Sequence, residues 1–321
     1  MSERVWTVVR SYRQMAIDAL TLQPPREGLV PHAELEMQLT QEFFGREYMP
    51  EDFRGKSNAE RERILEHNAE LMLEVAERFG YCFVLASPER VQKMQRRAPG
   101  RFLYIAHGDA TYGIPDGADM EEFALYLFEK PDEAKCQAAE RVRSTLEAGE
   151  QAMDMGVDGF ALCADYCFNS GPFLSPRMFA EFVTPFLAEL IDGYRRMEAY
   201  VIKHTDGNIM PILDQLVSCR PHALHSLDPV AGIDIAEVKR LYGKQVCLIG
   251  NVNCALLQTG TDDQVRQSAA YALEHGMPGG GYIFSTSNVI FKGLPPHRYE
   301  LMLSVRKEKG WYDGQGNVRR S

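Results

Sequence analysis

The chain has 321 residues and a mass of 36.3 kDa, with 45% apolar and 25% charged residues, a composition that excludes an intrinsically disordered protein. Its 45 acidic and 35 basic side chains give a formal net charge of −10, which argues against binding to nucleic acid or to an anionic membrane. No apolar run reaches the roughly 18 residues that a membrane helix needs.

The compartment is predicted from the first residues and the cysteines. The first 14 residues mix charged and apolar side chains and contain no signal-peptide core, so we expect a cytoplasmic protein. The seven cysteines are odd in number and form no CxxC pair, which is typical of free thiols in a reducing compartment.

Along the chain, short apolar runs alternate with longer segments of helical spacing. Residues 1–20 are predicted to form an amphipathic helix that ends before the Pro- and Gly-containing segment 23–28. The eight apolar runs predicted as strands are 29–34, 81–86, 101–107, 158–164, 200–204, 222–227, 245–250 and 281–285. The helices predicted between them include 58–79, 131–155, 175–197, 209–217, 235–241, 262–275 and 296–305.

This alternation predicts an α/β fold, a closed (β/α)8 TIM barrel. We expect one domain over residues 1–321, with residues 1–25 as an N-terminal helical extension. A doubly wound open sheet is the alternative, but no GxGxxG opens a helix after an early strand.

Active sites of such barrels lie at the C-terminal ends of the strands. The sequence is rich in polar residues at these positions, namely Glu34, His107, Asp109, Asp165, Tyr166, His204, Asp206, His225, Asp228, Asn251 and Ser285 through Asn288. A functional site is therefore expected there.

Several stretches together resemble the uroporphyrinogen decarboxylase (URO-D) superfamily. They are DGFALCADY at 158–166, GPFLSPRMF at 171–179, VIKHTDGN at 201–208, CLIGNVN at 247–253 and GGGYIFST at 279–286. Their order and spacing hold from about residue 155 to 310, whereas the N-terminal half matches only loosely.

The resemblance implies one of two activities. Decarboxylases of the superfamily need no cofactor; they hold a tetrapyrrole with an aspartate on its NH groups and arginines on its carboxylates. Methyltransferases of the superfamily move a methyl group between a small substrate, a corrinoid protein and an acceptor. They commonly carry zinc, with a His-x-Cys pair after the fifth strand and a Cys after the last.

Both branches differ from this chain in their motifs. The decarboxylase stretch that ends in Gln-Ala-Gly-Arg is replaced by residues 10–16, RSYRQMA, in a predicted helix, where Arg10 and Arg13 are expected on a solvated face. His204-Thr-Asp206 replaces His-x-Cys, and Ser287 and Asn288 stand where the last Cys is expected, which weakens a thiol-methylating role. A tetrapyrrole substrate with eight carboxylates would need clustered cations, but the predicted rim is acidic. The corrinoid-dependent methyltransferase branch is therefore favoured.

A zinc site is the corresponding prediction. His204 and Asp206 follow one strand as a His-x-Asp pair, and both residue types are good zinc ligands. His225 and Cys247, on the next two strands, are candidates for a third ligand, with a packing role in the core as the alternative for each. Zinc would activate the heteroatom that loses the methyl group.

The remaining candidates surround the predicted mouth. Asp165, Tyr166, Asp228 and Asn251 are expected to position the substrate or to act in acid–base catalysis. The expected substrate-binding residues are His107, Tyr112, Phe173, Ser285 and Asn288.

The resulting hypothesis is a methyltransferase that demethylates a small methoxylated or methylamine-type substrate. The methyl group would pass to cobalamin or a related corrinoid carried by a partner protein that docks over the mouth. A cofactor-free decarboxylase of the URO-D type and a non-catalytic ligand- or corrinoid-protein-binding relative stay open as alternatives. Assembly as a homodimer is also left open.

Overall fold

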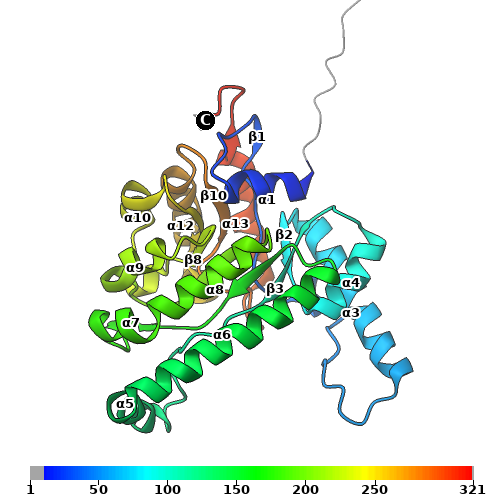
Figure 1. Ribbon diagram of the computed structural model, residues 1–321. Coiled ribbons are helices and arrows are strands. Elements are labelled where there is room, and N and C mark those ends of the chain that lie inside the picture. The colour runs from blue at the N-terminus through cyan, green and yellow to red at the C-terminus, as the bar shows by residue number, and fades with distance from the viewer. Residues whose placement is uncertain (1–10, 320–321) are drawn as a thin grey trace, which may run out of the picture.

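Seven parallel strands form the central sheet of the computed structural model, which describes residues 11–319 (Figure 1). They are β2 (Phe83–Leu85), β3 (Leu103–His107), β4 (Gly159–Leu162), β7 (Tyr200–Thr205), β8 (Ala223–Ser226), β9 (Cys247–Val252) and β10 (Tyr282–Thr286). Their order is β10-β9-β8-β7-β4-β3-β2. Successive strands of the sheet are therefore neighbours, as a repeated strand–helix unit requires.

The two edges of this sheet are joined by the segment predicted as the first strand, 29–34. His32 forms parallel bridges both to Tyr81, at the start of the β2 region, and to Phe284 in β10. The Ala33 amide donates to the Phe284 carbonyl at 3.3 Å. The segment thus occupies the eighth strand position and closes the barrel, which confirms the predicted α/β barrel fold.

Helices surround the barrel, and two short antiparallel strand pairs complete the described chain. The helices are α1 (Tyr12–Leu20), α2 (Thr40–Phe44), α3 (Asn58–Phe79), α4 (Pro88–Arg97), α5 (Met120–Glu129), α6 (Pro131–Asp154), α7 (Pro176–Phe182), α8 (Thr184–Arg196), α9 (Leu213–Ser218), α10 (Ile235–Tyr242), α11 (Cys254–Thr259), α12 (Asp262–Gly276) and α13 (Pro296–Lys309), with 3₁₀ turns η1 (Met210–Ile212) and η2 (Pro229–Ala231). β1 (Gly28–Leu29) pairs with β11 (Trp311–Tyr312), near the other end of the chain, and β5 (Cys167–Phe168) forms a hairpin with β6 (Gly171–Pro172). No helix within 11–319 is long and apolar enough to cross a membrane.

The long helix predicted over 175–197 is divided in two. α7 ends at Phe182 and α8 begins at Thr184, with Pro185 in its first turn. Proline has no backbone N–H and its ring excludes the preceding helical turn, so the chain restarts there.

Helix α1 covers the N-terminal end of the barrel. The helix was expected over 1–20; the observed part is Tyr12–Leu20, and residues 1–10 lie outside the described residues. Arg13 was expected on a solvated face, but its guanidinium pairs with Asp158 at 2.5 Å, because α1 packs against the start of the strands.

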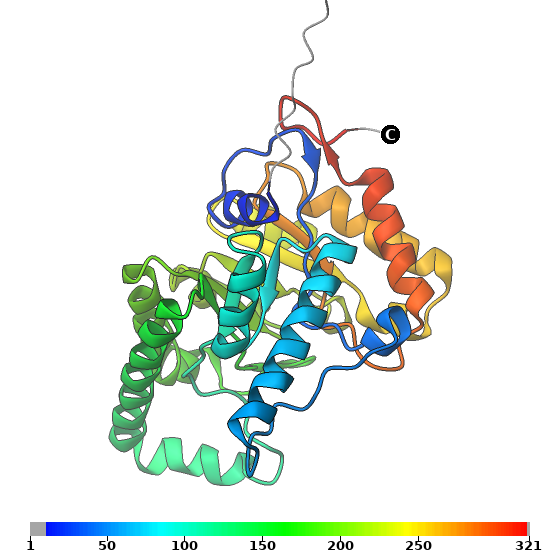
Figure 2. The ribbon, with the colours of Figure 1, turned by 90° about the vertical axis from the view of Figure 1, so that its right-hand side faces the viewer.

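The other end of the barrel carries the C-terminal ends of all the parallel strands. Helix α5 lies at this end, on the opposite side of the molecule from α1 and the C-terminus (Figures 1 and 2). Apolar residues fill the barrel wall, and every residue of β9 and β10 is buried. Polar side chains therefore gather at the mouth, where the strands end.

Candidate metal centre

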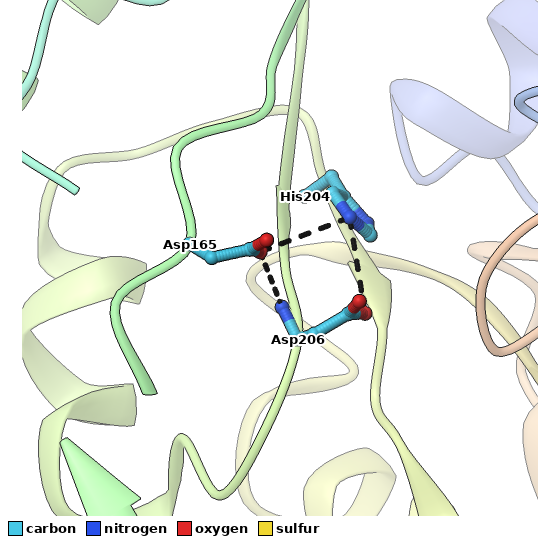
Figure 3. Close-up of side chains that lie close together, drawn as sticks. All are labelled: Asp165, His204 and Asp206. Carbon is cyan, nitrogen blue, oxygen red and sulfur yellow. Dashed lines mark hydrogen bonds and ion pairs between the residues drawn. The ribbon is translucent and has the colours of Figure 1, made fainter. Parts of the chain in front are cut away.

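Two carboxylates and an imidazole converge where β4 and β7 end. Asp165 follows β4, His204 lies in β7, and Asp206 follows β7 directly (Figure 3). The strands are adjacent and parallel, with Leu162 opposite Lys203, so both ends deliver side chains to one place. One ligand atom from each of the three residues lies within 4.8 Å of the others.

The spacing of these three side chains fits a metal ion. His204 Nε2 lies 3.9 Å from Asp165 Oδ1 and 3.8 Å from Asp206 Oδ1. These separations are too long for hydrogen bonds. They suit atoms that share a cation, because zinc binds nitrogen and carboxylate oxygen at about 2.0–2.2 Å. Within residues 11–319 no other group of three His, Cys, Asp or Glu side chains has this convergence.

A second histidine fixes the orientation of His204. The Nδ1 atoms of His204 and His225 are hydrogen-bonded at 2.8 Å, which leaves Nε2 of His204 directed at the two carboxylates. Burial lowers the pKa of His204 to about 4. The imidazole is therefore neutral at physiological pH, which is the form that binds metals.

The two carboxylates are held by hydrogen bonds rather than by cations. Asp165 Oδ1 accepts from the Asp206 amide at 2.9 Å. Asp206 accepts from Ser226 Oγ at 2.7 Å and from Asn288 Nδ2 at 2.5 Å. Burial, with the nearby charge of Asp165, raises the pKa of Asp206 to about 6. In the described chain neither Asp165 nor Asp206 forms an ion pair with lysine or arginine, so a divalent cation would relieve their repulsion.

A bend at the end of β8 brings two consecutive side chains to this centre. Ser226 and Leu227 have φ of 87° and 50°, in the left-handed region that side chains rarely adopt. The alternation of the strand ends there, so His225 contacts His204 while Ser226 contacts Asp206. The side chain of His225 therefore lies beside the candidate ligand His204.

The predicted third ligands are not brought to the ligand atoms. His225 lies behind His204, and its buried Nε2 has no hydrogen-bond partner. Cys247 begins β9, in register with Ala223, two positions before His225. Burial raises the pKa of its thiol far above the usual range. We correct the predicted set accordingly: Asp165 joins His204 and Asp206, and Cys247 packs in the barrel wall.

A buried ion pair supports the loop that carries Asp165. Lys203 is fully buried, and its Nζ donates to Asp109 Oδ2 and to the Ala164 carbonyl, both at 2.9 Å. The Nζ atom also lies 4.1 Å from the ring centroid of Tyr166. The Tyr166 hydroxyl contacts Thr111 Oγ1 at 2.6 Å, so this expected catalytic residue points into the support network instead of the mouth. A lysine inside an apolar strand was the available sequence signal for the network.

Asp228 and Asn251 shape the loop after β8. Asp228 is half-buried and accepts from the Val230 amide at 3.0 Å as the N-cap of η2, and burial raises its pKa. The side-chain Nδ2 of Asn251 donates to the Leu227 carbonyl at 2.9 Å. Both residues, which were expected to position the substrate, thus form hydrogen bonds with the backbone of the loop at the rim.

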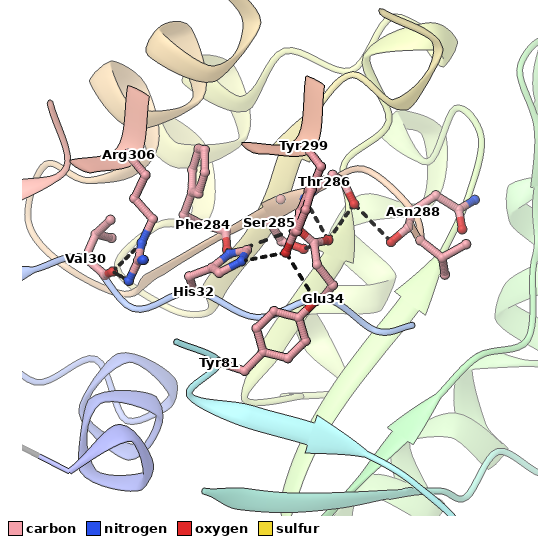
Figure 4. Close-up of polar contacts among 12 residues, drawn as sticks. Val30, His32, Glu34, Tyr81, Phe284, Ser285, Thr286, Asn288, Tyr299 and Arg306 are labelled. Atoms are coloured by element: carbon pink, nitrogen blue, oxygen red, sulfur yellow. Dashed lines mark hydrogen bonds and ion pairs between the residues drawn. The ribbon is translucent and has the colours of Figure 1, made fainter. Parts of the chain in front are cut away.

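A second polar network lies along the barrel seam (Figure 4). Glu34 is fully buried and accepts from Ser285 Oγ at 2.9 Å and from Thr286 Oγ1 at 2.6 Å. Burial raises the pKa of Glu34 to about 8. The predicted substrate contact of Ser285 is therefore replaced by a contact to Glu34. Asn288, also predicted for substrate, instead bonds Asp206.

The other predicted substrate residues divide between the mouth and its wall. His107 ends β3 with an exposed side chain. The Tyr112 hydroxyl is buried and donates to the Ala134 carbonyl at 2.9 Å. Phe173 lies between Phe168 and Phe123, with ring centroids 6.2 and 6.3 Å away. Only His107 of these three presents a polar atom at the mouth.

Comparisons with known proteins agree with this architecture. The family model "Uroporphyrinogen decarboxylase (URO-D)" matches residues 110–309. A uroporphyrinogen decarboxylase of Pseudoalteromonas translucida is 26% identical over 148 residues, which is 43% of this chain and 39% of that protein. One from Photobacterium profundum is 28% identical over 137 residues, 39% of this chain and 36% of that protein. The matches thus span less than two fifths of the length of these curated relatives.

Solved structures share the fold at low identity. A methyltransferase from Methanosarcina mazei superposes with a TM-score of 0.70 at 16% identity, covering 93% of this chain and 98% of that chain. A B12-independent methionine synthase from Shewanella sp. W3-18-1, in complex with selenomethionine, gives a TM-score of 0.51 at 12% identity, covering 89% and 97%. At these identities the likeness shows the fold alone.

Proposed function

The chain belongs to the uroporphyrinogen decarboxylase (URO-D) family, and we propose that it is a methyltransferase that demethylates a small substrate with the help of a bound zinc ion. The methyl group would pass to a corrinoid carried by a partner protein. The observation that carries the proposal is the convergence of Asp165, His204 and Asp206 at the barrel mouth. Their neutral imidazole and two uncompensated carboxylates are a suitable donor set for zinc.

In this proposal each residue has a separate task. Asp165, His204 and Asp206 would hold the zinc, which supplies a Lewis acid for the heteroatom that loses the methyl group. Ser226 and Asn288 keep the Asp206 carboxylate in place through their hydrogen bonds.

The reduced cobalt(I) corrinoid of the partner protein would supply the electron pair for the new bond to the methyl carbon. The bond from that carbon to the heteroatom would break, and the heteroatom would keep its electron pair and take up a proton. His107 is exposed at the same mouth, at the end of β3, so we assign the delivery of this proton to His107. Asp165 is the most exposed member of the triad, with 47% of its side chain accessible, and would face the substrate.

The charge of the mouth favours particular substrates. Asp165 and Asp228 each lie near Asp206, since the charges of both raise the pKa of Asp206. With zinc bound, the charges of Asp165 and Asp206 would be compensated, so the metal would accept a neutral heteroatom with a free electron pair, while Asp228 would still disfavour anions. Methylamine-type and methoxylated compounds therefore fit better than carboxylated ones.

Cofactor-free decarboxylation is the second candidate, favoured by the names of the curated relatives. A porphyrinogen carries many carboxylates, which need cations around the site. Arg13 is instead paired with Asp158 at the opposite end of the barrel, and Lys203 is committed to Asp109. Arg10 lies outside the described residues. The contacts of the residues at the mouth thus support methyl transfer better than decarboxylation.

The test measures metal and methyl transfer in the same preparations. We expect about one zinc per chain by mass spectrometry, and methyl transfer from a panel of methylamines and methoxylated aromatics to free cob(I)alamin, followed by the cobalt absorbance. His204→Ala should lose both while retaining its circular dichroism spectrum. His297→Ala, at an exposed histidine of α13, is the matched control and should lose neither.

Porphyrinogen decarboxylation that persists without metal would overturn the proposal in favour of the decarboxylase. A protein that binds zinc but shows neither reaction would support the non-catalytic alternative.

A further inference from the structure

We propose that residues 116–133, which include α5, form the docking surface for the protein that brings the methyl acceptor. We further infer that this partner presents a basic surface around an apolar centre. The inference rests on the proposed function and adds to it the place and the chemistry of the contact. It is carried by exposure, by continuity with the site and by charge.

Helix α5 exposes apolar side chains on one face. Phe128 is 82% exposed and Leu125 is 49% exposed. Residues three apart lie on the same face of a helix, so these two side chains form one patch. Leu127, on the other side of the helix, is buried. A largely exposed phenylalanine beside an exposed leucine is the kind of centre that protein interfaces bury.

An aromatic row connects the inner face of α5, behind this patch, to the metal centre. Phe168, 42% exposed on the β5–β6 hairpin, contacts Phe173, which stacks on Phe123 of α5. The Asn208 amide, two residues after Asp206, donates to the Phe168 carbonyl at 2.9 Å. The row therefore begins beside the ligand loop and ends on α5, at the mouth end of the barrel (Figure 2). A partner seated on α5 could reach the site.

The charge around the patch selects the occupant. Residues 116–133 contain seven acidic side chains and a single lysine, Lys130. Such a segment repels nucleic acid and anionic membranes. A symmetric contact between two copies would place the same carboxylates against each other, which also disfavours a second copy of this chain. Charge complementarity therefore favours, as the occupant of this surface, a partner protein with a basic rim.

Photo-crosslinking in the native host tests the surface directly. p-Benzoylphenylalanine replaces Phe128 in the full-length protein, and in a control it replaces Tyr271, a 44% exposed aromatic of α12. We expect position 128, and not position 271, to crosslink to one corrinoid-containing protein, in a yield that falls with added salt. Crosslinks to a second copy, crosslinks to proteins without corrinoid, or no signal above the control would overturn the inference.

A purified assay separates this inference from the proposed function. The double variant Leu125→Ser/Phe128→Ser should keep the zinc content and the rate of transfer to free cob(I)alamin. Its kcat/KM with the crosslinked corrinoid protein should fall at least tenfold, through KM, because the exposed centre of the contact is lost.

An unchanged kcat/KM with that protein would overturn the docking surface alone. Failure of the parent enzyme to methylate free cob(I)alamin would count against the proposed function instead.

Discussion

The Nδ1 atoms of His204 and His225 lie 2.8 Å apart, close enough that only one of the two can carry a proton toward the other. If Nε2 of His204 binds a metal, its own proton must sit on Nδ1 and His225 must accept it. The neutral His225 then carries its proton on Nε2, which is buried. The pair therefore couples the tautomer of a ligand to its neighbour, as outer contacts of metal sites commonly do.

Replacing His225 should weaken metal binding without removing a ligand. We predict that His225→Leu raises the zinc dissociation constant about 10- to 100-fold, because the ring of His204 loses the contact that orients it. Competition with a fluorescent zinc chelator measures the constant. His297→Leu should leave it unchanged, and an unaltered constant in His225→Leu would show that the pair is only packing.

Removing Asn288 should shift the pH dependence of metal binding upward. The side-chain Nδ2 of Asn288 donates to the Asp206 carboxylate, and this hydrogen bond lowers the pKa of Asp206, which burial has raised to about 6. In Asn288→Ala that pKa should rise further, so protons compete with zinc at higher pH. The loss of affinity should be larger at pH 6 than at pH 8.

Zinc titrations between pH 5.5 and 8 would measure this effect. Asn317→Ala, which removes a side-chain hydrogen bond to the carboxylate of Asp313 far along the chain, provides the control. Parallel losses of affinity at both ends of the pH range would contradict the explanation.

Removing one partner of the buried ion pair between Lys203 and Asp109 should strongly lower the free energy of unfolding. Burial alone would raise the pKa of Asp109, but the charge of Lys203 and hydrogen bonds from Thr111 lower it below the usual value. Lys203→Met leaves this charge uncompensated, at a cost of about 3–5 kcal/mol in the free energy of unfolding.

Lys203→Met/Asp109→Asn should lose less than Lys203→Met alone, because the remaining buried group is neutral. Urea unfolding of the single and double variants measures the difference. A double variant less stable than Lys203→Met would contradict the ion-pair account.

Glu34 should make the protein less stable as the pH rises. Its pKa is about 8 in the fold and 4.5 ordinarily, so between these values the folded chain binds a proton that the unfolded chain has released. The contribution is fully present below about pH 4.5 and is lost as the pH rises through 8, by on the order of a few kcal/mol.

Glu34→Gln should flatten the fall in unfolding free energy between pH 5.5 and 8.5, as measured with urea. Glu36→Gln, at the exposed carboxylate two residues later, should keep the fall of the parent. Equal slopes in Glu34→Gln and the parent would refute the assignment.

Much of the fold could be predicted because local signals agreed with it. The helix predicted over 58–79 has the same bounds in the structure, since Ser57 and Glu60 form a capping box and Gly80 ends the helix in a left-handed conformation. The β5–β6 hairpin could not be predicted, because strands of two residues have no periodicity. Helix α5 was missed because its exposed apolar face breaks the amphipathic pattern expected of a covering helix.

The site was only partly predictable. The place of His204 and Asp206 at a strand end predicts both as metal ligands, whereas the sequence indicates Asp165 as a site residue but not as a member of the group that could hold a metal. The position of His225 depends on the bend at Ser226, and that of Cys247 depends on strand register. Neither property is encoded in the spacing of residues along the chain.

The closure of the barrel by His32 bears on how the chain folds. Its bridge to Phe284 joins residues 252 positions apart, whereas most neighbouring strands are linked by one intervening helical segment. Contacts of such long separation are slow to form, because the entropy of a large loop is lost before any pairing compensates for it. The seam should therefore close late, after the seven-stranded sheet has assembled, and until then the edges at Tyr81 and Phe284 are open to pairing with another chain.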